Sequence, residues 1–238
     1  MACTNSLQRT VNFASIFSHL KPLTNIGGFA LEPALSVGDW VKNFILSPPF
    51  AWRWNRAVLG LAVGPNSQDY QVSLPSFGWL ERASVTDPSG VVHELEVVLN
   101  LGESSAQNLP VKIAARLDDN QGNITFRVFP LPNTTYTIYL SYQLAAPLFV
   151  QLTDTWAPIP DYFSYLYNQG FLAKIYEYGS DERFMPTMQL FVRQVIAANA
   201  GLSDTQINIF MEDRVNTALT GQSAQQSSQA GRQGRGAF

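Results

Sequence analysis

Apolar residues recur at helical spacing near the start of the chain and again in its last third. Within residues 36–46 they stand three and four positions apart, which predicts a helix with one buried stripe: Val37, Trp40, Val41, Phe44 and Ile45. Ser36 is the expected N-cap of this helix, and Pro48 and Pro49 are expected to stop it. A similar stripe predicts a short helix over residues 13–20.

Alternation with a period of two replaces this pattern in the middle of the chain. Residues 91–99, 111–117, 124–129 and 134–144 read as strands, and residues 118–123 read as a hairpin turn. In the last of these strands, one face is expected to be apolar (Tyr136, Ile138, Leu140, Tyr142) and the other to carry Thr137, Tyr139, Ser141 and Gln143. About six strands at this spacing predict a small antiparallel sheet, sandwich or open barrel.

Helical spacing returns after Pro160. A helix is expected over residues 161–178 with Gly179 as its C′ residue, followed by a helix that ends at Gly201 and has Pro186 in its first turns. The two would pack as an antiparallel hairpin, with Gly170 and Ala173 permitting close approach. A capping box from Ser203 to Gln206 opens a third predicted helix.

These patterns together predict an α+β fold, in which an antiparallel β domain packs on N- and C-terminal helices. We assign a helical segment to residues 1–56, the β domain to 57–150, and the helical hairpin with the third helix to 151–220. Residues 221–238 are rich in Gln, Ser, Gly and Ala, a composition that cannot bury enough apolar surface to fold alone. They are expected to form an extended tail that orders on a partner.

The composition changes this picture in one respect. Charged residues make up 14% of the chain and hydrophobic residues 46%, whereas soluble domains average about 25% charged residues. Low charge suggests a surface that neighbouring subunits cover. The net charge of -3 indicates neither nucleic acid nor membrane as a partner, and Cys3, the single cysteine, allows no disulfide within the chain. The N-terminus lacks a signal-peptide pattern, so assembly inside the cell is expected.

The residues that catalysis needs are not grouped in any recognisable motif. His19 and His93 are the only histidines, and neither lies near a candidate nucleophile in sequence. Asp118 to Gly122 resemble the start of a calcium loop, but the twelfth position is Phe129 where that loop needs Glu. Phosphate-binding glycine motifs are absent from the sequence. We therefore expect no enzymatic activity, no cofactor and no metal, and a structural role for His93.

Two of the 5 tryptophans, Trp52 and Trp54, stand two residues apart where the helical pattern gives way to strands. If this stretch leaves the helix as a strand, both indoles point to one side. Trp156 lies where the chain returns from strands to helices. We predict that these three indoles meet at the seam between the sheet and the helices. Core packing is the ordinary role for them, and a contact between subunits is the alternative.

Several stretches resemble a known family. They are "LSPPFAWRWNRA" after the first helix, "YTIYLSYQLAAP", "LTDTWAPIPDYFSYLYNQGFLAKIYEYGSDERF" and "MQLFVRQVI". This arrangement looks like the head-to-tail adaptor (neck or connector) proteins of tailed bacteriophages, in which short N-terminal helices and a β insertion pack against C-terminal helices. The resemblance covers roughly residues 36–56 and 136–200. The middle strands and the tail are not part of it, and the β portion is larger than is usual in that family.

The resemblance implies a structural virion protein that forms a homo-oligomeric ring, a dodecamer, between the portal protein and the tail or nozzle proteins. Such a ring would be assembled in the host bacterial cytoplasm and would touch passing DNA only non-specifically. The tail residues that we expect to bind a partner are Gln222, Gln229, Arg232, Arg235 and Phe238, because Arg and aromatic side chains dominate interfaces. An alternative is another tail, collar or host-surface-binding protein that recognises its target through loops of the β domain.

Overall fold

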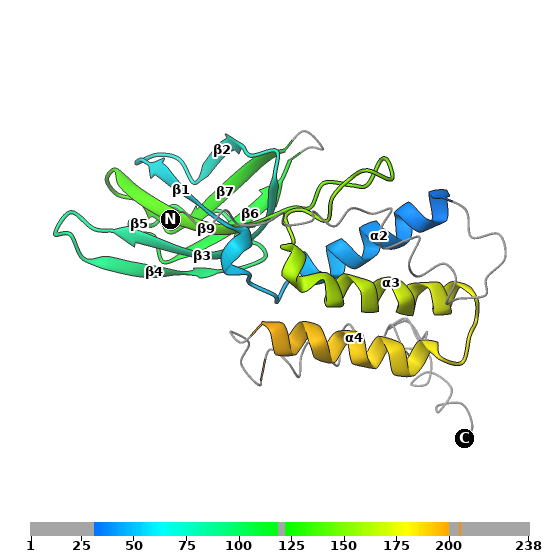
Figure 1. The fold of residues 1–238 in the computed structure, drawn as a ribbon. Helices are drawn as coiled ribbons and strands as arrows, with labels where there is room; N and C mark the ends of the chain where they lie inside the picture. Colours follow the sequence, from blue (N-terminus) through cyan, green and yellow to red (C-terminus); the bar gives the residue numbers. More distant parts are fainter. Residues whose placement is uncertain (1–30, 119–121, 200–204, 206–238) are drawn as a thin grey trace, which may run out of the picture.

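The computed structural model describes residues 31–118, 122–199 and 205. A barrel of strands lies beside a layer of three helices (Figure 1). Helix α2 (Leu31–Leu46) leads through a short 3-10 turn, η2 (Arg53–Asn55), into the barrel. After the last strand the chain returns through a second 3-10 turn, η3 (Asp161–Phe163), to helices α3 (Ser164–Tyr178) and α4 (Phe184–Ala198).

The strands form a seven-stranded sheet that curls into a nearly closed, open barrel. The strand order is β1-β9-β3-β4-β6-β7-β2, with β1 (Arg56–Val63), β2 (Asp69–Ser73), β3 (Phe77–Thr86), β4 (Val92–Val97), β6 (Lys112–Leu117), β7 (Asn123–Phe129) and β9 (Tyr136–Leu144). At one end the Tyr70 hydroxyl of edge strand β2 accepts the Gly64 N–H just after β1, at 3.1 Å. The predicted α+β class with an antiparallel β domain packed on helices is confirmed.

One pair in this sheet, β4 with β6, is parallel, contrary to the all-antiparallel expectation. The connection over residues 98–111 explains the difference, because parallel neighbours need a long crossover that an antiparallel hairpin does not. Within that connection, β5 (Gln107–Asn108) pairs in parallel with β8 (Leu131–Pro132) as a separate two-stranded sheet.

The barrel interior is filled as the alternation along β9 predicts. Tyr136, Ile138, Leu140 and Tyr142 are all buried there. They pack with apolar side chains from the other strands, among them Leu61, Val63, Val85, Leu95, Ile113, Ile124, Phe126 and Val128. Burial of such side chains is the main term that holds the sheet curled, because each large one contributes about 1.5–3 kcal/mol.

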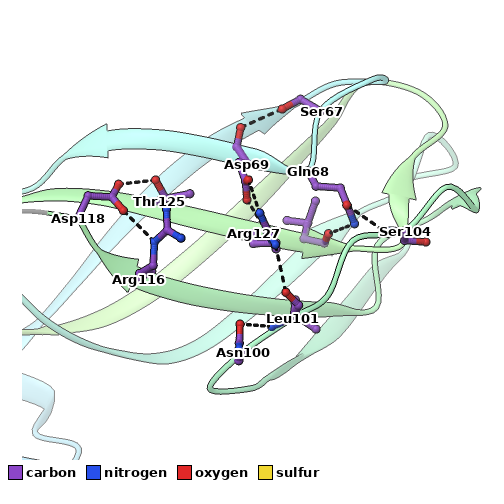
Figure 2. A network of polar contacts seen from close by, with 11 residues as sticks. Ser67, Gln68, Asp69, Asn100, Leu101, Ser104, Arg116, Asp118, Thr125 and Arg127 are labelled. Atoms are coloured by element: carbon purple, nitrogen blue, oxygen red, sulfur yellow. Dashed lines mark hydrogen bonds and ion pairs between the residues drawn. The ribbon is translucent and has the colours of Figure 1, made fainter.

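Polar contacts fix the outer side of the barrel near edge strand β2 (Figure 2). The Arg127 guanidinium of β7 donates to both carboxylate oxygens of Asp69 at 2.6 Å, and also to the Leu101 carbonyl at 3.2 Å. The hydrogen bonds from Arg127 lower the pKa of Asp69 below its usual value. One side chain therefore ties β2 and the long 98–111 connection to β7.

Helix α2 begins earlier than its apolar stripe suggests. Ser36 lies inside the helix and is exposed, so the expectation that it caps the N-terminus is wrong. The stripe extends one turn further back to the fully buried Ala34, and Pro33 is tolerated because it lies in the first turn. Of the predicted buried face, Val37, Val41 and Ile45 are buried, whereas Trp40 and Phe44 are partly buried against the same core. The helix ends before Pro48, as predicted.

Helices α3 and α4 form the expected hairpin, and Figure 1 shows α2 lying along α3. The turn differs from the prediction at one residue: Gly179 has a φ of -82°, and Ser180 takes the left-handed conformation with a φ of 50°. The Ser180 N–H donates to the Glu177 carbonyl and the Asp181 N–H to the Tyr176 carbonyl. This is a Schellman motif shifted by one residue from the expected position.

Candidate functional site

A cleft of about 1040 Å³ opens where the barrel meets the helical layer. We call it the seam cleft. Four regions that are distant along the chain line it: Pro48, Pro49, Ala51, Trp52, Arg53, Trp54 and Arg56; Trp79, Glu81 and Arg82; Tyr162 and Phe163; and Ala198 and Asn199.

The aromatic wall of the seam cleft comes from the stretch between α2 and β1 and from η3. The expectation that Trp52 to Trp54 form a strand is wrong, because residues 53–55 make the 3-10 turn η2 and the strand starts at Arg56. The two indoles nevertheless lie together, with ring centroids 5.3 Å apart. Phe163 packs on both, at 5.3 Å from Trp52 and 6.0 Å from Trp54.

A chain of buried polar groups joins this wall to the barrel. The Gln143 side chain is fully buried; its Oε1 accepts the Trp52 backbone N–H at 3.1 Å and its Nε2 donates to Glu81 Oε2 at 2.7 Å. Arg56 Nε donates to the same carboxylate oxygen at 2.8 Å. Gln143 does lie on the non-core face of β9, as predicted. The face is nevertheless buried at this end, where the Trp52 backbone and the Glu81 side chain contact Gln143.

Two indoles, those of Trp52 and Trp79, hold the C-terminal end of α2 against this site. Trp52 Nε1 donates to the Ile45 carbonyl at 2.7 Å, and Trp79 Nε1 of β3 donates to the Leu46 carbonyl at 3.0 Å. Asn55 Nδ2 donates to the Leu144 carbonyl at 2.8 Å. The last carbonyls of a helix have no partner within it, so these indoles satisfy groups that would otherwise be orphaned.

The seam cleft carries excess positive charge. Of its three arginines only Arg56 is paired, with Glu81, while Arg53 and Arg82 are exposed and form no ion pair within the described residues. Among the described residues that line it there is no His, Cys or Ser, the side chains most often used as catalytic base or nucleophile. Among the described residues, His, Cys, Asp and Glu also form no group of three that could hold a metal ion.

Trp156 occupies a different place from the other two predicted indoles. It is fully buried and stacks on Tyr167 of α3, with centroids 4.3 Å apart and rings inclined by 10°. Phe149 meets it edge-on at 5.0 Å. Trp52 and Trp156 belong to the same apolar core, but the ring contacts of Trp156 are made within the helical layer and its adjoining loop.

A second feature is the loop after β9, residues 145–154, which extends along α2 (Figure 1). It presents three exposed apolar side chains, Leu148, Val150 and Leu152, at 65%, 80% and 38% exposure. We call these three residues the apolar loop.

The chain that carries the apolar loop is held by α2 and by its own Asp154. Lys42, only 1% exposed, donates to the Pro147 carbonyl at 2.9 Å and lies 3.7 Å from the centre of the Phe149 ring. Asp39 accepts the Phe149 N–H at 2.8 Å, and Asp154 accepts the N–H groups of Val150 and Gln151 at 2.7 and 2.9 Å. Burial lowers the pKa of Lys42 to about 8, against the opposing effect of Asp39 and Asp154.

The remaining predicted residues fall elsewhere. His93 lies on β4, where its Nε2 is 2.9 Å from Asp87 Oδ2 in the β3–β4 turn, which is a structural contact. The predicted partner-binding residues Gln222, Gln229, Arg232, Arg235 and Phe238 lie outside the described residues, as does His19. Helix 13–20 and nearly all of the third predicted helix also lie there.

Comparison with known proteins leaves the fold and the site to be interpreted on their own. No protein-family model matches the chain, and no curated protein matches it significantly. Within the described ranges, none of the helices has the length and apolar character needed to cross a membrane.

Sequence reasoning missed several residues of the seam cleft. Trp79, Glu81 and Phe163 come from segments whose patterns indicate only a strand or a helix start, and nothing local marks them as neighbours of Trp52. The apolar loop did have a signal: "PLFVQL" is rich in large apolar residues between two predicted elements, where polar residues are usual.

Proposed function

We propose that this chain is a structural assembly subunit of a phage-like virion, and specifically a head-to-tail adaptor that forms a ring between portal and tail. The observation that carries the assembly role is the apolar loop. The adaptor identity rests on the sequence resemblance given above, with which the packing of α2 against the α3–α4 hairpin is consistent.

The apolar loop is suited to bind a neighbouring copy of the chain. Its backbone is held by Lys42, Asp39 and Asp154, so little conformational entropy is lost when it docks. Its three apolar side chains remain in water in the isolated subunit, and burying each fully would contribute about 1.5–3 kcal/mol. A patch on one face of a subunit that fits a different face of the next copy generates a closed ring when the rotation closes.

Assembly rather than catalysis is also what the chemistry of the seam cleft favours. Among its described lining residues, the one carboxylate, that of Glu81, is engaged by Arg56 and Gln143, and no base–nucleophile pair is present. In this proposal the portal protein and the tail or nozzle proteins bind the two faces of the ring. The predicted tail anchors, from Gln222 to Phe238, would contact one of them.

The test is the oligomeric state of the purified chain, with and without a portal partner, measured by sedimentation velocity. The variant Leu148→Ser/Val150→Ser/Leu152→Ser should remain monomeric under conditions in which the unchanged chain forms rings. Its unfolding midpoint should equal that of the unchanged chain. The matched control is Val58→Ser/Val92→Ser, which changes two barrel side chains of similar exposure, 64% and 63%. Equal assembly by the loop variant would refute the role of the loop.

Electron microscopy of assembled particles then shows where in the virion the protein lies. A ring at the portal vertex supports the adaptor. A peripheral trimer would instead support the alternative, a tail, collar or host-binding protein, and would refute the adaptor assignment.

A further inference from the structure

The size and lining of the seam cleft suit a peptide segment. Its volume of about 1040 Å³ is at the upper end of the range for small-molecule sites. Aromatic rings supply much of the lining, and the exposed Arg53 and Arg82 add two cations that no described carboxylate neutralises. The matching occupant is a segment with large apolar side chains and an excess of carboxylates.

The described chain leads into this cleft. Helix α4 ends at Ala198, and both Ala198 and Asn199 are part of the lining. Asn199 is buried, and its Nδ2 donates at 3.3 Å to the carbonyl of Ala51, another lining residue. An extended chain covers at most about 3.5 Å per residue, so residue 203 begins within roughly 14 Å of the Asn199 Cα.

The sequence that follows has the required chemistry. In residues 203–219, apolar side chains recur at helical spacing on one stripe: Ile207, Phe210, Met211, Val215 and Ala218. The same segment carries three carboxylates, on Asp204, Glu212 and Asp213, against the single Arg214. The cleft has three arginines against one glutamate, so the two charge balances are opposite.

We infer that residues 203–219 of the same chain dock into the seam cleft, with the apolar stripe against Trp54, Tyr162 and Phe163 and the carboxylates facing Arg53 and Arg82. The buried Trp54 indole N–H, which donates to no acceptor within the described residues, borders this binding surface. The inference is independent of the proposed ring, because it concerns a contact within one subunit.

The short tether favours this occupant over others. A segment attached a few residues from its site binds at an effective concentration in the millimolar range, so even a weak contact is well populated. Nucleic acid is disfavoured because two unpaired guanidiniums release few counterions.

The experiment measures amide hydrogen exchange in residues 203–219 of the full chain as a dilute monomer. The amide groups of the segment should exchange at least about tenfold more slowly than those of an unstructured peptide. A tenfold slower rate means that the docked state is about tenfold more populated than the undocked state, which even a weak contact can achieve. The variant Arg53→Glu/Arg82→Glu and the variant Glu212→Arg/Asp213→Arg should each raise the exchange rate about fivefold, as expected for the loss of two exposed ion pairs. Combining all four changes should restore the slow rate.

The control is Arg116→Glu, the same charge reversal on β6 of the barrel, which should leave exchange in this segment unchanged. Arg53 and Arg82 are exposed, so their variants are expected to fold, and the Glu212/Asp213 variant tests the contact from the other side. The inference is overturned if exchange is as fast as in a free peptide, if the four-residue charge swap fails to restore it, or if protection falls on dilution, which would indicate docking on another copy.

Discussion

The contact between α3 and its neighbours gives the sharpest test of the helical packing. Gly170 lies in the middle of α3, and a Cβ atom placed there would be 2.8 Å from two ring atoms of Phe191 and 2.9 Å from Cγ1 of Val41. Carbon atoms normally pack 3.5–4.0 Å apart, so both neighbours must retreat by about 0.6 Å or more. Phe191 and Val41 are almost completely buried, and Phe191 also packs on Phe44 with centroids 5.0 Å apart.

Two opposing terms set the effect of Gly170→Ala on stability. Alanine in a helix interior is favoured over glycine by about 1 kcal/mol. Overpacking a filled core costs about 1–3 kcal/mol. Three close contacts from two helices place this site toward the upper part of that range, so we expect a net loss of about 1–2 kcal/mol in the free energy of unfolding, a substantial fraction of a typical total of about 5–15 kcal/mol.

Urea unfolding followed by tryptophan fluorescence and far-UV circular dichroism measures this change. Gly60→Ala is the control, because a Cβ there meets only Thr137 and Tyr139 at 3.9 Å. The loss should shrink when Gly170→Ala is made in a Phe191→Leu background, since leucine lacks the two ring atoms that clash. A Gly170→Ala variant about 1 kcal/mol more stable than the unchanged chain would refute close packing of α3 on α2 and α4.

Two further predictions concern charge and backbone conformation. The pKa of Lys42 is about 8 in the folded chain and 10.5 in the unfolded chain, so the unfolded state binds more protons between these two pH values. The free energy of unfolding, measured by urea titration, should therefore rise with pH over roughly 8 to 10. Lys42→Met should flatten this rise. Burial raises the pKa of Tyr167, so stability should fall again above about pH 10 in both proteins. Ser180 has a φ of 50°, a left-handed conformation that glycine adopts without the steric cost that a Cβ brings. Ser180→Gly should therefore raise the free energy of unfolding by about 1 kcal/mol and raise the thermal midpoint. An unchanged or lower midpoint would contradict the left-handed turn.

The elements that sequence predicted best are those whose apolar period is long and uninterrupted. The alternating apolar residues from Tyr136 to Tyr142 are all buried as expected, and the stripe from Val37 to Ile45 faces the core, with Trp40 and Phe44 partly buried. The parallel pairing of β4 with β6 could not be predicted, because strand periodicity carries no information on the direction of a neighbour. The turn at Ser180 was displaced by one residue because glycine there is preferred but not required.

The seam cleft was only partly predictable for a similar reason. The proximity of Trp52 and Trp54 followed from their spacing, although through a 3-10 turn rather than a strand. Alternation placed Gln143 on the non-core face of β9 but could not show that this end of the face is buried, because only tertiary structure decides what covers a face. Its partners Glu81 and Trp52 come from separate elements that lie far from it in the sequence.

The tryptophans at the seam supply an indole N–H donor that phenylalanine lacks. Phe163 lies among them and supplies only apolar area, whereas Trp52 and Trp79 also donate hydrogen bonds to the Ile45 and Leu46 carbonyls. A buried acceptor without a donor costs about 1–3 kcal/mol, so an indole gains over a phenyl ring at both positions. The helix end is thereby joined to the barrel by donors from two directions, which fixes how the helical layer sits on the barrel. The same joint sets the orientation of the apolar loop, which is held on α2, relative to the seam cleft beside the barrel.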